Sequence, residues 1–288
     1  MQLDRAQQLI DHINAAHGFR FTLQSRYQDG VVGAWSVMDP EGRRAVLKGN
    51  DGMAHRIARL PQIVERIRAA GYPTPAWIVA GVTDDGGAYH LVDFAPGEPM
   101  SNHPLTAESA AQLVAVIETQ VGFDPDPQQD WSGYMPSAAF GESEGDPRPE
   151  VRRIGRPGVE LLEHFDAVLA PYRGFEVPRG DLVHGDFNTC NVLIDKGKIS
   201  GVIDVDACGS GTRAVDYAWL LREAYVRDAD PQAIATIRRA GEAVAGPGVL
   251  TICAAATAFD IIRFQYTHEP ESAPGILPGL HRLADALE

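Results

Sequence analysis

One short stretch constrains this chain more than any other, a polar loop set between apolar segments at residues 182–209. The loop contains a His-Gly-Asp tripeptide that ends at Asp186, then four residues, then Asn191. Asp204 follows thirteen residues later, inside the apolar run GVIDVD. Short apolar runs that alternate with polar turns predict strands entering and leaving the loop. The fold must therefore place two carboxylates and an amide at strand ends.

These residue types have the spacing of a kinase catalytic loop and of the metal-binding aspartate that follows it. In-line phosphoryl transfer needs a carboxylate that accepts and orients the attacking hydroxyl, which suits Asp186. Mg²⁺ prefers oxygen ligands, which Asn191 and Asp204 would supply. Each residue alone would more often be a turn or cap residue. In this order and spacing, Asp186, Asn191 and Asp204 are predicted to be catalytic, the last two as metal ligands.

The segments HGDFNTCNVLI, GVIDVD and AVDYAWLL resemble the aminoglycoside phosphotransferase and choline kinase superfamily. The specific part of the resemblance is confined to about residues 182–221. It implies an α+β fold of the two-lobed protein-kinase-like type, with a small antiparallel-sheet N-lobe and a larger, mainly helical C-lobe. It also implies that Asp216 braces the catalytic loop from a helix start. His184 is grouped with the nucleotide-binding residues, as a scaffold of the loop rather than an acid or base.

The same resemblance predicts the division of the chain and its phosphate-binding lysine. Residues 1–95 are expected to form the nucleotide-binding lobe, and residues 96–288 the catalytic and substrate-binding lobe. Lys48, in the strand-like AVLKG, resembles the lysine that holds the phosphates. That lysine normally pairs with a glutamate on the following helix, but Pro61 occupies the expected position. Glu65, one turn later, is the available substitute, while Pro61 either starts a helical piece or kinks one.

HLVDFAPGEP resembles the hinge between the lobes, where the main chain holds the base of ATP or GTP. The Asp93 carbonyl and the Ala95 amide are the expected partners. In the preceding QDGVVG, Gly30 and Gly33 either form a hairpin turn or bring backbone amides to a phosphate. Asp206 is either a further metal-site carboxylate or a strand-end cap.

Composition limits the partners and the compartment of this 288-residue chain. A net charge of -14 argues against a nucleic-acid or anionic-membrane partner and favours a cationic substrate, although an acidic surface also serves solubility. Cys190, Cys208 and Cys253 lack metal-type spacing and are expected to be reduced thiols, with Cys190 a small packed residue. The N-terminus does not resemble a signal peptide, and no apolar run reaches membrane-spanning length. A cytoplasmic location is expected.

Residues 122–150 are rich in Pro, Gly, Ser and acidic residues, and they predict either a mobile acidic loop or a solvated connector. With Asp260 and Glu269 of the final helices, this segment is expected to help form the acceptor site of a cationic substrate. Its seven acids, against the single base Arg148, are Asp124, Asp126, Asp130, Glu142, Glu144, Asp146 and Glu150.

The resemblance therefore implies a Mg²⁺-dependent phosphotransferase that moves the γ-phosphate of ATP or GTP to a hydroxyl of a small molecule. An antibiotic such as an aminoglycoside is the leading expectation for that molecule. The alternative is a metabolic kinase for choline, ethanolamine, homoserine, a sugar or a nucleoside. A catalytically silent nucleotide-binding module is a third possibility, which the intact set of polar residues disfavours. A protein kinase is disfavoured because no Ala-Pro-Glu segment follows Asp204.

Overall fold

The computed structural model describes residues 1–27, 33–49, 51–141 and 146–288. These residues form two compact units. Unit 1 contains Met1–Gly97 together with Ser200–Asp206, and unit 2 contains Glu98–Ile199 together with Ala207–Glu288. The boundary expected after residue 95 thus lies after Gly97. In addition, a second stretch that carries Asp204 belongs with the N-terminal residues.

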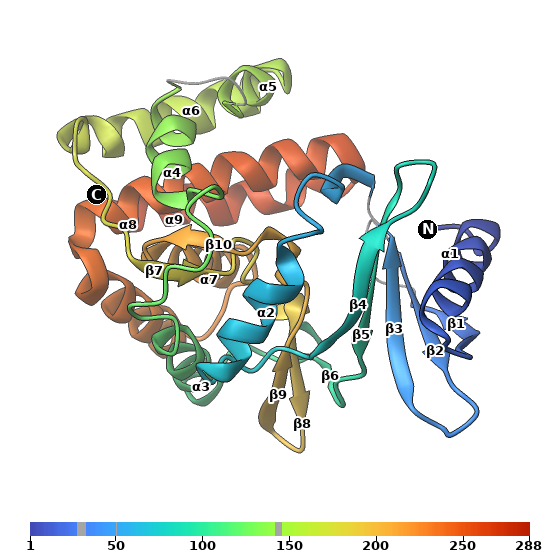
Figure 1. The fold of residues 1–288 in the computed structure, drawn as a ribbon. Coiled ribbons are helices and arrows are strands. Elements are labelled where there is room, and N and C mark those ends of the chain that lie inside the picture. The colour runs from blue at the N-terminus through green and yellow to red at the C-terminus, as the bar shows by residue number, and fades with distance from the viewer. Residues whose placement is uncertain (28–32, 50, 142–145) are drawn as a thin grey trace. The chain divides into compact units, whose positions relative to one another are not determined.

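Unit 1 combines helices with a five-stranded antiparallel sheet of order β1-β2-β3-β5-β4 (Figure 1). This confirms the predicted small antiparallel sheet. The elements are α1 (Leu3–His17), β1 (Thr22–Arg26), β2 (Ala34–Met38), β3 (Arg44–Gly49), the 3₁₀ helix η1 (Asp51–Met53), α2 (Leu60–Ala69), β4 (Trp77–Val82) and β5 (Ala88–Asp93).

Helix α1 covers one face of this sheet because its apolar residues recur at helical spacing. Leu9, Ile10 and Ile13 are buried against Leu47 of β3 and Leu91 of β5. Full burial of an aliphatic side chain contributes roughly 1.5–3 kcal/mol. This core fixes the strand that carries Lys48 without using that lysine.

Helix α2 begins at Leu60, and Pro61 lies in its first turn. A proline is tolerated there because the first amides of a helix have no intrahelical partner. Pro61 therefore starts the helix rather than kinking it. The buried face consists of Leu60, Ile63, Val64 and Ile67.

The stretch that carries Asp204 is held in unit 1 by hydrogen bonds to two loops. The Val202 amide donates to the Pro73 carbonyl at 2.7 Å. The Ser200 hydroxyl donates to the Pro96 carbonyl at 2.5 Å. Asp204 follows directly, so its position is set by the backbone of unit 1.

Unit 2 is mainly helical, as predicted, with two small sheets of order β10-β7 and β6-β8-β9. Its core includes Phe165 packed edge-to-face on Phe259, with ring centroids 5.4 Å apart. The strands of these sheets are β6 (Glu98–Pro99), β7 (Asp181–Val183), β8 (Val192–Asp195), β9 (Lys198–Val202) and β10 (Gly209–Gly211). Strand β9 passes into the unit 1 stretch at Ser200, and the 3₁₀ helix η5 (Val205–Ala207) begins in that stretch. The helices of unit 2 are η2 (Met100–Asn102), α3 (Ala107–Glu118), α4 (Trp131–Phe140), α5 (Arg148–Arg153), α6 (Arg156–Leu169), η3 (Ala170–Tyr172), η4 (Thr189–Asn191), α7 (Ala214–Val226), α8 (Pro231–His268), η6 (Ala273–Ile276) and α9 (Leu277–Leu287).

Helix α8 is interrupted at Gly246, whose φ of 83° is not helical. Within the described residues, α8 is the one helix that is long and apolar enough to cross a membrane, judged by length and composition alone. However, 72% of its most apolar window is buried in the structure. Such burial is typical of the core helix of a folded unit.

The acidic segment 122–150 contains more structure than a mobile loop or a solvated connector. Helix α4 fills its middle and α5 begins near its end. The Asp130 carboxylate caps α4 by accepting a hydrogen bond from the Gly133 amide at 3.0 Å. The Asp126 amide donates to the Ser210 hydroxyl of β10 at 2.9 Å. Glu142 and Glu144 lie outside the described residues.

Candidate functional site

The catalytic loop predicted from the sequence connects β7 to β8 in unit 2, and two amides hold its aspartate. Oδ1 of Asp186 accepts a hydrogen bond from Asn188 Nδ2 at 2.8 Å. Oδ2 accepts one from Asn191 Nδ2 at 2.9 Å. These two hydrogen bonds fix the orientation of the carboxylate within the loop. Asn188 was not predicted to belong to the site. Its position two residues after Asp186 could have indicated that its side chain contacts the Asp186 carboxylate.

Asn191 is oriented by the same contacts. Its Nδ2 also donates to the Asp186 main-chain carbonyl at 2.9 Å. The amide nitrogen is thus used within the loop, which leaves the amide oxygen as the group available to a metal ion. A hard cation such as Mg²⁺ prefers oxygen donors, and Asn191 fits that requirement.

Asp216, at the start of α7, braces the loop as the resemblance implies. Its carboxylate accepts hydrogen bonds from the His184 amide at 2.7 Å, the Gly185 amide at 3.0 Å and Gln120 Nε2 at 2.9 Å. Asp216 is completely buried, and burial raises its pKa to about 7 although these hydrogen bonds oppose the shift. Gln120 is a further member of the site that the sequence did not reveal.

A second brace comes from the next turns of α7. Glu223 accepts a hydrogen bond from the Thr189 amide at 2.8 Å and also bonds the Thr189 hydroxyl. Arg227 Nη1 lies 3.2 Å from Glu223 and donates to the Thr189 hydroxyl at 2.6 Å. The loop is therefore held on both sides of Asp186 by carboxylates of one helix.

His184 is completely buried, with Nδ1 accepting a hydrogen bond from the Asp186 amide at 3.2 Å. Its ring packs edge-to-face on Phe187, with centroids 5.6 Å apart. A buried imidazole bonded to its own loop is a scaffold residue, as expected. The accompanying expectation that it belongs with the cofactor-binding residues stays a prediction.

Gly185 lies against the indole of Trp131 from α4. It adopts a φ of 80°, and a Cβ added there would meet Cζ2 of Trp131 at 2.2 Å. Trp131 Nε1 also donates to the Ala207 carbonyl at 3.0 Å. The glycine of the His-Gly-Asp tripeptide is thus required both by its backbone conformation and by the neighbouring ring. Trp131 was not predicted, because nothing in its local sequence indicates this contact.

In unit 1, Lys48 forms an ion pair with Asp204, with Nζ 2.7 Å from Oδ1. Asp204 has a φ of 64°, a conformation that residues with a Cβ adopt rarely and that is often found at functional sites. The predicted phosphate-binding lysine and the predicted metal ligand therefore lie side by side.

Glu65 was expected to pair with Lys48. It is exposed on α2, and among the ion pairs of the described residues Lys48 is joined to Asp204. The physical reason is the helix face: α2 buries Ile63, Val64 and Ile67, which turns Glu65 outward. The expectation that Glu65 replaces the usual helix glutamate therefore stays a prediction, with Glu65 exposed in this structure.

Asp206 lies beside His90 rather than in the open. Its Oδ1 is 3.5 Å from His90 Nε2, and its main-chain carbonyl accepts a hydrogen bond from Arg56 Nη1 at 2.9 Å. His90 stacks on Trp77 at 4.3 Å between ring centroids. Burial lowers the pKa of His90, although Asp206 opposes the shift.

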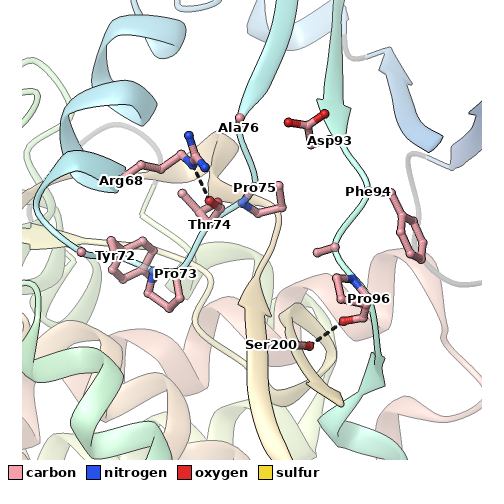
Figure 2. A pocket seen from close by; sticks show the side chains of 12 residues that line it. Arg68, Tyr72, Pro73, Thr74, Pro75, Ala76, Asp93, Phe94, Pro96 and Ser200 are labelled. Atoms are coloured by element: carbon pink, nitrogen blue, oxygen red, sulfur yellow. Dashed lines mark hydrogen bonds between the residues drawn. The ribbon is translucent and has the colours of Figure 1, made fainter. Parts of the chain in front are cut away.

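The hinge residues line a cavity of about 370 Å³ in unit 1 (Figure 2). The Asp93 carboxylate pairs with Arg43 at 2.5 Å, so its side chain is engaged, and the Asp93 amide donates to the Ala76 carbonyl at 2.8 Å. Among the described residues, none accepts a hydrogen bond from the Ala95 amide. That amide is therefore available to a base. Gly33 has a φ of 71°, as turn glycines do, while Gly30 lies outside the described residues.

The acids expected to face a cationic acceptor are largely engaged with other groups. Asp130 pairs with Arg179 at 2.6 Å. Asp260 accepts hydrogen bonds from the Tyr134 hydroxyl at 2.8 Å and from Arg263 at 3.0 Å. Burial raises the pKa of Asp260, and these two partners oppose the shift.

The structure also corrects the prediction that Cys190 is a packed residue. Cys190 is exposed in the loop, whereas Cys208 and Cys253 are buried, and all three are free thiols. Among the described residues, no group of three or more His, Cys, Asp or Glu side chains could hold a metal ion.

Comparisons with known proteins agree with this architecture. The profile of the phosphotransferase enzyme family matches residues 25–251. The fold is similar to that of aminoglycoside-3'-phosphotransferase of type VIII, with a TM-score of 0.62 and 23% identity over 87% of this chain and 98% of that chain. It is similar to aminoglycoside phosphotransferase APH(4)-Ia, with a TM-score of 0.68 and 18% identity over 98% of each chain. It also resembles the amicoumacin kinase hAmiN, solved with AMP-PNP, Ca²⁺ and Ami, with a TM-score of 0.62 and 15% identity over 99% of this chain and 96% of that chain. No curated protein sequence matches the chain significantly. These structures confirm the expected kinase-like fold.

Proposed function

The chain belongs to the phosphotransferase enzyme family, and from that premise we propose that it transfers the γ-phosphate of ATP or GTP to a hydroxyl of a small molecule. The observation that carries the proposal is the carboxylate of Asp186, whose two oxygens accept hydrogen bonds from the side-chain amides of Asn188 and Asn191. Such a group can accept the proton of an attacking hydroxyl. General-base catalysis of this kind contributes roughly 10²–10⁴-fold to a rate.

The remaining residues divide between nucleotide and metal. Lys48 would bind the phosphates, and the Ala95 amide with the Asp93 carbonyl would bind the base. Asn191 and Asp204 would hold Mg²⁺, which when bound neutralises phosphate charge and orients the γ-phosphate. The ion pair of Lys48 with Asp204 places the proposed phosphate-binding group beside a proposed metal ligand.

The acceptor that we propose first is an antibiotic, with aminoglycosides the leading class. Two structural neighbours are named as aminoglycoside phosphotransferases and a third as an amicoumacin kinase. The alternative is a metabolic hydroxyl compound such as choline, ethanolamine, homoserine, a sugar or a nucleoside. Both acceptor classes use the same transfer chemistry and differ in the walls of the acceptor site.

The test is a coupled nucleotide-turnover screen of purified protein with ATP and GTP, against aminoglycosides, amicoumacin-type antibiotics and small alcohols. Turnover that depends on an acceptor supports the proposal, and the acceptor identifies the class. Asp186→Asn should reduce kcat by roughly 100-fold or more with little change in nucleotide affinity. Asp195→Asn is a matched control, because that aspartate is exposed at the end of β8. A variant Asp186→Asn that retains near wild-type kcat would exclude the assigned base, and nucleotide binding without transfer to any acceptor would favour the silent module.

A further inference from the structure

The backbone on either side of Asp204 is held at two points within unit 1. Two residues before it, the Val202 amide donates to the Pro73 carbonyl at 2.7 Å. Two residues after it, the Asp206 carbonyl accepts a hydrogen bond from Arg56 Nη1 at 2.9 Å. We propose that Arg56 is a positioning residue for metal binding, because it holds the backbone that orients the Asp204 carboxylate. This inference rests on the proposed function, in which Asp204 is a metal ligand.

The backbone conformation of Asp204 is one that needs support. Its φ of 64° lies in the left-handed region, which residues with a Cβ adopt rarely. Such a conformation costs energy and persists only where the surrounding structure over-determines it. If one of the two holding points is lost, the backbone can relax and the carboxylate then points elsewhere. Mg²⁺ demands near-ideal octahedral geometry, so a ligand that has turned away binds the ion less well.

Arg56 is built into unit 1 and is only 5% exposed. It lies in the turn between η1 and α2, where its amide donates to the Met53 carbonyl at 2.9 Å. The next residue, Ile57, is buried and its amide donates to the same carbonyl at 2.9 Å. The base of the arginine side chain is thus fixed. Because arginine is rarely buried without a partner, its bond to a carbonyl 150 positions away is a specific feature of this fold.

The side chains of the same stretch are held separately, by the sheet. Lys48 of β3 and His90 of β5 lie directly opposite each other, so they share one face of the sheet. Lys48 pairs with Asp204 at 2.7 Å, and His90 Nε2 lies 3.5 Å from Asp206 Oδ1. The sheet therefore contacts the two carboxylates, whereas Arg56 bonds the main chain. This division gives Arg56 an effect that does not depend on the role of the Asp206 carboxylate.

Loss of Arg56 should accordingly weaken metal binding more than nucleotide binding. Lys48 and the main chain of the hinge, which we assign to the phosphates and the base, remain in place without it. Replacement of a residue that orients a metal ligand typically reduces metal affinity by about 10–100-fold. We expect the lower end of that range, about tenfold, because the bond between Val202 and Pro73 still holds the other side of Asp204.

The experiment compares the calorimetric affinity of a non-hydrolysable ATP or GTP analogue in Mg²⁺ with its affinity in EDTA, on the full chain. The ratio of the two affinities measures how tightly the protein–nucleotide complex binds Mg²⁺. Arg56→Met, which removes the donors, should lower this ratio about tenfold and leave the affinity in EDTA unchanged. Arg56→Lys should lower it less, because the lysine keeps a donor that lies one bond closer to the backbone.

The matched control is Arg238→Met in unit 2. Arg238 Nη1 likewise donates to a main-chain carbonyl, that of Ala286, at 2.5 Å. Its replacement should lower the free energy of unfolding without changing the ratio. A wild-type ratio in Arg56→Met, or in Arg56→Lys if Arg56→Met does not fold, would overturn the positioning role. An equal loss of affinity in Mg²⁺ and in EDTA would also overturn it, because that result is expected of a purely structural arginine.

The same variants separate this inference from the proposed function. A lowered ratio in a protein that transfers phosphate to no acceptor would refute the proposed function and support the positioning role of Arg56. An active phosphotransferase whose Arg56→Met variant keeps the wild-type ratio would overturn the positioning role and leave the proposed function standing.

Discussion

Replacing Gly185 with alanine should destabilise unit 2 and slow phosphoryl transfer together. Its φ of 80° costs a residue with a Cβ roughly 1–2 kcal/mol. The new Cβ would also lie 2.2 Å from Cζ2 and 2.4 Å from Cε2 of Trp131, so the ring or the loop must move. Overpacking of this kind costs about 1–3 kcal/mol. The free energy of unfolding should therefore fall by roughly 2–5 kcal/mol.

The matched control is Gly197→Ala in the turn between β8 and β9. Gly197 has a φ of 77°, and a Cβ added there would meet no atom within 4 Å. It carries the backbone cost without the clash. Urea unfolding gives the loss of unfolding free energy for each variant, and the difference between the two losses is the cost of the contact with Trp131. The comparison requires that the slope of the unfolding free energy against urea concentration is the same in both variants.

A second variant tests whether Trp131 is the partner. Adding Trp131→Leu to Gly185→Ala should restore at least about 1 kcal/mol relative to the sum of the two single changes, because the clash disappears. The kcat of Gly185→Ala should fall more than that of Gly197→Ala, since Asp186 is the next residue. Equal losses of stability in the two glycine variants, or no coupling with Trp131→Leu, would refute this reasoning.

Three further predictions concern metal, proton and charge. Asp204→Ala should abolish Mg²⁺-dependent nucleotide binding, because one metal ligand and the partner of Lys48 are lost together; calorimetry that shows unchanged affinity would contradict the assignment. Burial raises the pKa of Asp216 to about 7, so the folded protein binds a proton more tightly than the unfolded chain. The unfolding free energy of the wild type minus that of Asp216→Asn should therefore fall as pH rises from about 4 to about 7 and then level off, and a flat difference would exclude the raised pKa. If the acceptor is cationic, its KM should rise with ionic strength and the rise should be smaller in Asp124→Asn, whereas a flat salt series would exclude an acidic acceptor wall.

The choice of acid for the last experiment follows from the structure. Asp130 caps α4, so its replacement would cost about 1 kcal/mol of stability and confuse the result. Asp126 is buried. Asp124 is exposed, so a change there alters charge with little effect on packing.

Much of the site could be predicted because its chemistry is local in sequence. Asp186 and Asn191 lie in one loop, and their hydrogen bonds to each other are made within five residues. For such residues, spacing within one loop implies contact. The role of Asp216, 32 residues after His184, was instead predicted from the family resemblance.

What could not be predicted depends on which face of a helix packs inward. The outward position of Glu65 follows from the buried side chains of α2, which a count of residues does not show. Helix α4 was missed because its sequence is apolar on all sides and contains Pro136, so it has no helical stripe. The contact of Trp131 with Gly185 joins residues more than fifty positions apart. Neither local sequence contains a pattern that predicts this contact.

The assignment of residues 200–206 to unit 1 has a practical consequence for anyone who wishes to study the units apart. The chain passes from one unit to the other three times, after Gly97, Ile199 and Asp206. A fragment cut at the first passage would lose the Val202 bond to Pro73 and the ion pair of Lys48 with Asp204, so it should be less stable than the complete unit. An N-terminal fragment suited to crystallisation or to a split reporter needs the seven-residue segment appended through a short linker, and its partner fragment needs a loop that bridges the gap.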